Sequence, residues 1–387
     1  MFGFQLWREF KLSIAEISAV FPEWKTVYFS KEILILDFEN NNIKEEILKK
    51  ANFLGWTIKI IEIIKNEDNL DISNIILNKS KNHEWKFKYW VNIFWENLNL
   101  KKILNKTKTL LKNNFISSRF VNKDFKNLSS SQIIWEKLIK NNSDYNLIIW
   151  DNKNFIWKSI WVQDINNYSK RDWQKDRDMQ TWMLPPKLAQ IMINLSGWTK
   201  IYDPFVWLGT VLIESVLMWN KNIYWSDLSE RMVDISRNNI KSLNYELHTL
   251  DIFNQNSKYI WEVEFLWENK VDAIVTEWYL WEVMTKKNID LERIEKQKES
   301  LTKLYEWFFS GLQNKKYNWN IVISFPFWEI KWKYFYFNEI YKVLEKYCDI
   351  QKILPEDIDL LETRSGSLLY KREKQLVGRE IFKLKIK

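Results

Sequence analysis

The stretch Ile201–Asp227 holds the residues whose types and spacing point most directly to chemistry. A predicted strand, Lys200–Asp203, ends on an aspartate and is followed by the loop 204–209 and by a helix that begins near Thr210. In a doubly wound α/β sheet, the crevice between this strand and helix binds a nucleotide-like cofactor. Small loop residues let the backbone approach the ligand, and the helix amides face its carboxylate or phosphate end.

Two further acidic residues follow the next predicted strands of the same sheet. Asp227 closes the strand that begins at Asn222, 24 residues after Asp203, and an acid at this place accepts hydrogen bonds from ribose hydroxyls. Asp251 follows the strand Glu246–Leu250, from where its carboxylate can reach the amino group of an adenine ring. Since no P-loop lysine accompanies these acids, the pattern disfavours a nucleoside triphosphatase. A dinucleotide-dependent dehydrogenase would share the ribose-binding acid.

The tryptophan and glycine counts both depart far from ordinary usage. The chain has 24 Trp and only 7 Gly, whereas average usage of about 7% would give roughly 27 glycines. Turns between strands and helices need glycine for positive φ and close backbone approach, and here such turns hold tryptophan, as at Trp207. We infer that many Trp positions are glycine in the cell, because a source that reads the UGA codon as glycine would produce this pattern. The alternative is a genuinely Trp-rich protein.

With glycine at position 207, the residues from Asp203 to Thr210 spell D-P-F-V-G-L-G-T, which resembles motif I of class I methyltransferases. This resemblance favours S-adenosylmethionine over NAD as the cofactor. An indole at position 207 would occlude the pocket, so the predicted site depends on glycine there. The predicted cofactor-binding residues are Asp203, Phe205, Trp207, Gly209, Thr210, Asp227, Leu228, Asp251 and Ile252.

A second group of candidate residues lies at the end of the fourth predicted strand, Ala273–Thr276. Amino-methyltransferases place a D/N-P-P-Y/F motif there, whose polar side chain and backbone carbonyl hold an exocyclic amine while the aromatic ring stacks on the base. That geometry directs the nitrogen lone pair at the methyl group. This chain reads T-E-W-Y, so the tyrosine matches and the prolines are missing. The resemblance gives Thr276, Glu277 and Tyr279 as catalytic residues, and an ordinary strand end is the alternative.

Positive charge is concentrated in one segment of the chain. The net charge is +8; residues 1–75 hold 9 Lys and Arg against 12 Asp and Glu, whereas residues 76–140 hold 14 against 4. Such a concentration is typical of a nucleic-acid-binding surface. One cysteine, Cys348, excludes a disulfide framework, and two histidines disfavour a histidine-based metal site, so no metal is expected. The sequence shows neither a bilayer-spanning apolar run nor a signal peptide, which favours a cytoplasmic enzyme.

Local patterns predict three domains. Residues 1–75 form a small α/β unit, and residues 76–165 contain the basic block with an amphipathic helix at Leu100–Asn113. A polar, aperiodic linker, Tyr168–Thr181, opens the last domain, residues 166–387, whose alternating strands and helices predict an open, mostly parallel sheet covered on both faces. A C-terminal hairpin, whose basic residues we expect at a solvated edge, is predicted from Leu368–Arg372 and Val377–Ile381.

Taken together, these features resemble the THUMP-containing tRNA guanosine N2-methyltransferases that modify guanosine 10. Leu54–Lys59 is similar to that family's L-G-G-T-I-K element, and Met183–Ala189 is similar to the helix before motif I. The resemblance implies an α/β fold, in which a Rossmann-like class I methyltransferase domain follows an α+β ferredoxin-like unit and a THUMP RNA-binding domain. The basic segment 76–140 would grip tRNA phosphates while one base is flipped out and stacked on Tyr279.

The sequence therefore predicts an enzyme that moves a methyl group from S-adenosylmethionine to the exocyclic N2 of a guanosine in tRNA. Two alternatives stay open. The same core would serve an enzyme that methylates amines of ribosomal RNA or DNA. The other alternative is a non-catalytic RNA-binding protein with a degenerate methyltransferase fold, because the T-E-W-Y segment departs from the family motif.

Overall fold

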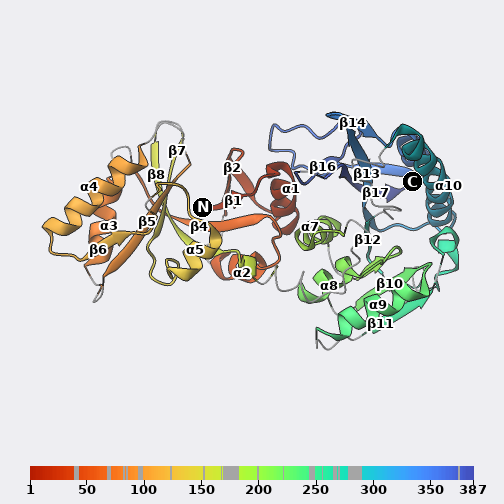
Figure 1. Cartoon of the computed structure of the whole chain (residues 1–387), viewed down its shortest axis with the longest axis horizontal. Helices are drawn as coiled ribbons and strands as arrows, with labels where there is room; N and C mark the ends of the chain where they lie inside the picture. The colour runs from red at the N-terminus through yellow and green to blue at the C-terminus, as the bar shows by residue number, and fades with distance from the viewer. Residues whose placement is uncertain are drawn as a thin grey trace. The chain divides into compact units, whose positions relative to one another are not determined.

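The chain divides into two compact units (Figure 1). The first contains Met1–Phe10, Glu23–Asn52 and Thr57–Lys170, and the second contains Lys11–Pro22, Phe53–Trp56 and Arg171–Lys387. The computed structural model describes residues 1–38, 43–67, 71–81, 83, 86–94, 99–122, 124–150, 153–166, 168, 183–197, 200–220, 222–243, 249–254, 256–264, 268, 271–277, 290–373 and 375–387.

Strands and short helices alternate in the first unit. Its sheet has the order β2-β3-β1-β4-β8-β7-β5-β6, in which β5 runs parallel to β6 and β7 and the other neighbours are antiparallel. The elements are β1 (Phe2–Leu6), β2 (Lys25–Phe29), β3 (Ile33–Asp37), α2 (Ile43–Ala51), β4 (Thr57–Glu67), α3 (Ile72–Ser80), β5 (Phe87–Ile93), α4 (Leu100–Asn113), β6 (Ser118–Phe120), α5 (Ser130–Trp135), β7 (Asp144–Trp150) and β8 (Lys153–Val162).

The basic helix α4 confirms the predicted bounds Leu100–Asn113. Its start is fixed by Asn99, whose side-chain oxygen accepts a hydrogen bond from the Lys102 amide at 3.0 Å. Leu104 and Leu111 are buried on one side of the helix, while its lysines are exposed. Apolar residues at this spacing hold the helix on the sheet and leave the charged side in solvent.

The described strands on both sides of the predicted boundary between residues 75 and 76 form one sheet. Strand β4 pairs antiparallel with β8 over most of its length, and β8 pairs with β7. The pairing joins segments about 100 residues apart in sequence, which local periodicity cannot indicate. The first unit is therefore a single structural body over the strands β1 to β8.

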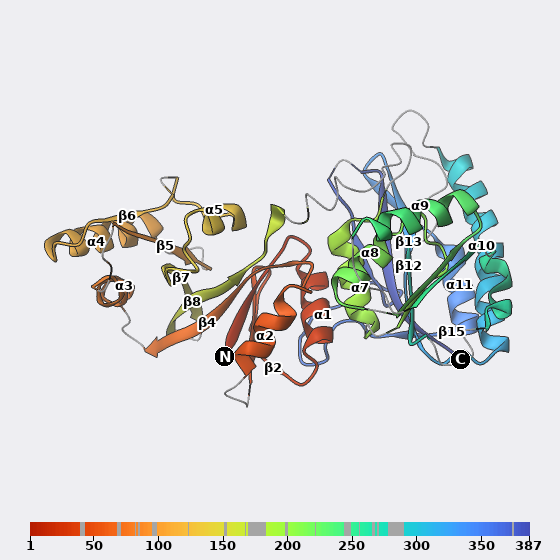
Figure 2. The same ribbon diagram turned by 90° about the horizontal axis from the view of Figure 1, so that it is seen from below.

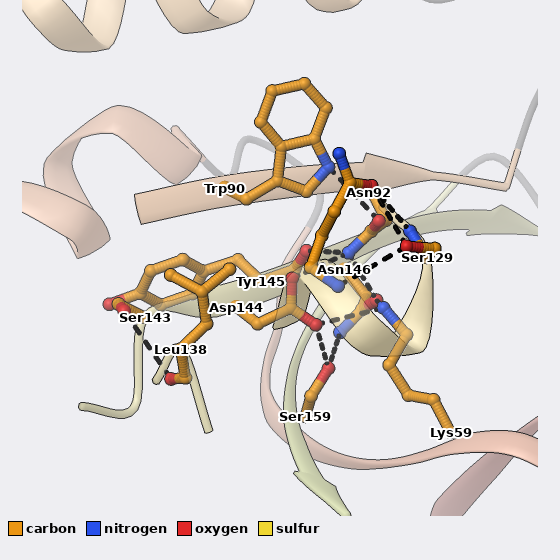
Figure 3. Close-up of polar contacts among 11 residues, drawn as sticks. Lys59, Trp90, Asn92, Ser129, Leu138, Ser143, Asp144, Tyr145, Asn146 and Ser159 are labelled. Carbon is orange, nitrogen blue, oxygen red and sulfur yellow. Dashed lines mark hydrogen bonds and ion pairs between the residues drawn. The ribbon is translucent and has the colours of Figure 1, made fainter. Parts of the chain in front are cut away.

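A buried polar network crosses four neighbouring strands of this sheet, β4, β8, β7 and β5 (Figure 3). The Lys59 ammonium on β4 lies 3.0 Å from an Asp144 carboxylate oxygen and donates to the Asn146 side-chain oxygen at 2.8 Å, both on β7. Asn92 on β5 and Ser159 on β8 donate to the same carboxylate at 2.9 and 2.5 Å. Burial lowers the pKa of Lys59, and the charge and hydrogen bond of Asp144 oppose that effect.

The second unit contains the longer α/β alternation that the sequence predicts. Its elements are α1 (Phe10–Val20), α7 (Pro186–Ser196), β9 (Ile201–Asp203), α8 (Thr210–Leu217), β10 (Asn222–Asp227), α9 (Glu230–Lys241), β11 (Thr249–Asn254), the short 3₁₀ helix η1 (Ser257–Glu262), β12 (Ala273–Glu277), α10 (Leu291–Asn314), β13 (Asn320–Ile330), β14 (Lys333–Tyr336), α11 (Asn338–Tyr347), β15 (Cys348–Gln351), β16 (Leu368–Tyr370) and β17 (Val377–Ile386).

The sheet of this unit has the order β11-β10-β9-β12-β13-β17-β15, with β14 paired to β13 and β16 to β17. Neighbours from β11 to β13 are parallel, whereas β17 is antiparallel to β13, β15 and β16. The sheet is therefore mixed, since the C-terminal hairpin β16–β17 inserts its long strand between β13 and β15. Helices α7 and α8 lie on one face, and α10 and α11 lie on the other (Figure 2).

Two short segments from the N-terminal part of the chain belong to the second unit. Glu16 of α1 is wholly buried, and its carboxylate accepts hydrogen bonds from the Gly55 amide at 2.7 Å, the Trp56 amide at 3.1 Å and the Asn194 side chain on α7 at 2.8 Å. Burial raises the pKa of Glu16 to about 7, although these donors oppose the shift. A Cβ at Gly55 would lie 2.4 Å from the Lys187 carbonyl oxygen, so this turn requires glycine.

Candidate functional site

The loop between β9 and α8 lies at the topological switch point of the sheet, where β10 and β12 flank β9. Gly209, the residue before α8, has φ 79°, and a Cβ there would lie 3.1 Å from the Ser236 Cβ. Trp207 also lies in the left-handed region, with φ 50°. Side chains other than glycine are disfavoured in this region because the Cβ crowds the following carbonyl. The loop therefore has the glycine-type backbone at both places where the predicted motif needs it.

Asp203 at the end of β9 is buried, with 2% of its surface exposed. Its carboxylate accepts hydrogen bonds from the Thr276 hydroxyl at 2.6 Å and from the Phe205 amide at 3.2 Å. Burial raises the pKa of Asp203 to about 7; the two hydrogen bonds oppose this, and the charges of Asp227 and Glu277 add to it. Asp203 thus ties the ends of β9 and β12 together.

Asp227 at the end of β10 holds the neighbouring loop. One carboxylate oxygen accepts from the Trp207 amide at 3.0 Å, and the other accepts from the Ser229 amide at 2.9 Å. Burial raises the pKa of Asp227, and these backbone donors oppose the shift. Leu228 beside it is 67% exposed, and Thr210 is the first residue of α8. These residues meet at one edge of the sheet, as the sequence predicts.

Phe205, one of the predicted cofactor-binding residues, packs against the core of the second unit. Its ring packs against Tyr305 and Phe308 of α10, with centroids 5.9 Å away in both cases. The ring therefore anchors the loop to the core beside α10. The Pro204 carbonyl next to it accepts from the Ser257 hydroxyl at 2.7 Å, which holds the same loop.

Asp251 and Ile252 lie within β11, in contrast to the predicted strand Glu246–Leu250 with Asp251 just beyond it. The strand continues through Phe253 because Thr249–Asn254 pairs in parallel with Asn222–Asp227. In this register Asn254 is opposite Asp227 at the carboxyl end. The side chains of Asp251 and Ile252 lie outside the described part of the structure.

The predicted catalytic residues Thr276 and Glu277 have different surroundings at the end of β12. Thr276 is wholly buried, and its hydroxyl donates to Asp203, so it is not open to a substrate. Glu277 keeps 15% side-chain exposure, and one of its oxygens accepts from the Arg379 guanidinium of β17 at 2.5 Å. Tyr279 lies outside the described residues, as does most of the predicted linker Tyr168–Thr181.

Comparisons with known proteins concern the domain that holds these residues. Residues 173–324 match the model of a family described as RMKL-like, methyltransferase domain. The second unit is a Rossmann-like methyltransferase domain. TrmN from Thermus thermophilus shares 12% identity and a TM-score of 0.50, over 100% of this chain and 99% of that chain. A predicted N6-adenine-specific DNA methylase from Listeria monocytogenes shares 9% identity and a TM-score of 0.44, over 99% and 95%. No curated protein matches the sequence.

Arg379 is the site residue that sequence reasoning missed. The C-terminal hairpin itself is confirmed, but the expectation that its basic residues lie at a solvated edge is wrong for Arg379, which is 3% exposed. The cause is the position of β17 inside the sheet, between β13 and β15. No local signal in Val377-Gly378-Arg379-Glu380 marks an arginine that reaches the end of β12.

The first unit presents its positive charge along α4. Lys106 pairs with Asp71 at 2.7 Å, whereas Lys101 and Lys108 lie over the rings of Phe125 and Phe120, each 5.7 Å from the centroid. Phe115, just beyond the helix, is 98% exposed. Exposed lysines beside an exposed aromatic ring offer both phosphate neutralisation and a stacking surface.

Neither a membrane span nor a metal centre is found in the part of the chain that the structure describes. No helix there is both long and apolar enough to cross a bilayer. Among the same residues, no three His, Cys, Asp or Glu side chains are grouped as metal ligands would be.

Proposed function

We propose that this chain transfers a methyl group from S-adenosylmethionine to the exocyclic N2 of a guanosine in tRNA. The observation that carries the proposal is the meeting of Asp227, the 204–209 loop and Glu277 at one edge of a methyltransferase domain. The described α4 surface of the first unit supports an RNA substrate over a small molecule.

The residues present fit S-adenosylmethionine by their chemistry. Asp227 would accept the ribose hydroxyls, and the 204–209 backbone with the start of α8 would face the methionine carboxylate. Leu228 would cover the adenine ring, with Asp251 and Ile252 at the neighbouring strand. When bound, the cofactor supplies a methyl carbon on a sulfonium; the amine nitrogen bonds to that carbon while the carbon–sulfur electron pair goes to sulfur.

The fit requires a small residue at position 207, which supports the proposal that tryptophan here stands for glycine. Trp219 and Trp332 support it independently. Trp219 has φ 67° just after α8, and the Asn220 amide donates to the Ser215 carbonyl at 3.0 Å, as in a helix end that normally uses glycine. Trp332 has φ 67° in the two-residue turn between β13 and β14, where glycine is also preferred.

The first unit is proposed to hold tRNA through the ferredoxin-like and THUMP-like parts of its sheet. The βαββαβ order of β1 to β4 with α1 and α2 supports the first part, and the exposed lysines of α4 support the second. Phosphate contacts would position the RNA without reading its sequence. The target base would leave its helix and stack on Tyr279.

Incubation of the purified full chain, with glycine at position 207, with methyl-labelled S-adenosylmethionine and tRNA, ribosomal RNA or DNA tests the proposal. We expect label in tRNA, and nuclease digestion should yield N2-methylguanosine. Label in ribosomal RNA or DNA alone would favour the first alternative. No transfer to any of them, by a chain that binds the cofactor, would favour a non-catalytic RNA-binding protein.

A further inference from the structure

The ion pair between Arg379 and Glu277 joins two strands that are not neighbours. In the sheet, Glu277 of β12 is opposite Ser324 of β13, and Arg379 of β17 is opposite Pro326 of β13. The guanidinium therefore reaches across β13 to the end of β12. Arg379 is 4% exposed at its side chain and Glu277 is 15% exposed. Because solvent ions screen a buried ion pair only weakly, the attraction holds the two groups in a well-defined geometry.

Contacts with Glu277, Met183 and Tyr370 are among those that fix the guanidinium of Arg379. Its Nε donates to Glu277 at 2.5 Å, and a terminal nitrogen donates to the Met183 carbonyl at 3.3 Å. The group also lies 6.0 Å from the ring centroid of Tyr370. The next residue, Glu380, faces the opposite side of the sheet, where the Tyr341 hydroxyl donates to it at 2.7 Å.

Among the residues that the structure describes, only one carboxylate oxygen of Glu277 is engaged. Arg379 donates to Oε1, and no described residue donates to Oε2. The Thr276 hydroxyl cannot donate to Oε2, because it is buried and donates to Asp203. Glu277 is thus the acid at this strand end that keeps both solvent exposure and an open acceptor oxygen among the described residues.

We propose that Arg379 is a positioning residue that aims the open oxygen of Glu277 at the exocyclic amine of the target base. This inference rests on the proposed function. The carboxylate accepts an N–H of the amine and so orients the nitrogen lone pair. After nitrogen has bonded to the methyl carbon, it carries an extra proton, and that proton passes to Glu277.

The charges around Glu277 suit this task. Burial raises the pKa of Glu277, while Arg379, through its charge and its hydrogen bond, and the more distant charge of Arg372 lower it. The charge of Glu277 in turn helps to raise the pKa of the buried Asp203 carboxylate on β9. Arg379 therefore favours the ionised form of Glu277, which can only accept hydrogen bonds.

A double-mutant cycle on the full chain tests the pair, with Arg379→Met, Arg379→Lys, Glu277→Gln and the double variant Arg379→Met/Glu277→Gln. We expect Arg379→Met to lower kcat about 100-fold, with the KM for the cofactor unchanged. Arg379→Lys should restore part of the loss. The double variant should be no slower than Glu277→Gln alone, because the arginine acts through that carboxylate. Lys385→Met, an exposed cation on the same strand, is the matched control and should keep wild-type kcat.

The pH profile separates positioning from a merely structural role. Without Arg379 the pKa of Glu277 rises further, so the acid-side fall of kcat should move to higher pH in Arg379→Met. It should move less in Arg379→Lys, which keeps the positive charge, and should disappear in Glu277→Gln. An active Arg379→Met with wild-type kcat and an unmoved pH profile overturns the inference alone. If Arg379→Met fails to fold, Arg379→Lys and the double variant decide by the same criteria. A wild-type chain that methylates nothing overturns the proposed function itself.

Discussion

At the scale of single residues, backbone conformation separates two groups of tryptophans. Trp207, Trp219 and Trp332 have positive φ, which costs an L-residue with a Cβ roughly 1–2 kcal/mol. Trp56 and Trp225 are buried in the second unit, and the Trp225 indole donates to Ser236 at 2.9 Å. The three tryptophans with positive φ therefore lie where the backbone conformation favours glycine: in the predicted cofactor loop, at a helix end and in a hairpin turn.

We predict that peptides from the native protein carry glycine at positions 207, 219 and 332. Mass spectrometry of protein from the source organism measures this directly, and tryptophan at 207 would contradict it. In the printed sequence, Trp332→Gly should raise the free energy of unfolding by about 1 kcal/mol, because it relieves the left-handed strain at a 93% exposed side chain. Trp307→Gly, in the middle of α10, is the control and should lower it by about 1 kcal/mol.

At the scale of elements, the buried network around Lys59 and Asp144 explains why the first unit is one body. The pair connects β4, which belongs to the first predicted domain, with β7, which belongs to the second. Both side chains are buried, at 1% and 0% exposure. A buried charge without its partner is strongly unfavourable, so the network favours one strand order and register over alternatives.

We predict that Asp144→Asn destabilises the first unit by about 3–5 kcal/mol, because it leaves the Lys59 ammonium buried without a counter-charge. Hydrogen exchange of the β5 and β7 amides under native conditions measures the change. Glu46→Gln removes the exposed i,i+4 pair with Lys50 on α2 and is the control, with an expected effect below about 0.5 kcal/mol. A cost under 1 kcal/mol for Asp144→Asn would contradict the prediction.

At the scale of the whole molecule, charge and chemistry lie in different units. The exposed lysines of α4 belong to the first unit, whereas the strand-end carboxylates belong to the methyltransferase domain. The proposed methyl transfer to a base in tRNA would need both, because phosphate contacts supply affinity and the domain supplies the reaction. Substitutions in the first unit should therefore change RNA binding and leave cofactor binding alone.

We predict that the triple variant Lys101→Gln, Lys108→Gln and Lys112→Gln binds tRNA more weakly and with a shallower salt dependence. Each lost phosphate contact should reduce the slope of log K against log salt by about 1. Fluorescence titration with tRNA at several salt concentrations measures this, and calorimetry checks that S-adenosylmethionine binding is unchanged. The control is a triple variant in which three exposed lysines of the second unit, Lys342, Lys352 and Lys385, are changed to glutamine. An unchanged slope in the α4 variant would remove the RNA surface from the proposal.

The sequence by itself determined what local periodicity and composition carry. Periodicity predicted the bounds of α4, the strand, loop and helix around Asp203 and Thr210, and the acid at the end of β10. Composition showed the excess of tryptophan over glycine. These features depend on residues within a few turns of one another, so the pattern of apolar and turn-forming residues is enough to predict them.

Only the tertiary structure decided the contacts between distant strands. Lys59 and Asp144 are 85 residues apart, and Glu277 and Arg379 are 102 residues apart. Strand pairing brings each couple together, and no periodicity in one strand specifies which other strand will be its neighbour. The same long-range pairing joins strands of two predicted domains in one sheet. It also brings the Thr276 hydroxyl to Asp203, to which it donates, and pairs Glu277 with a buried arginine.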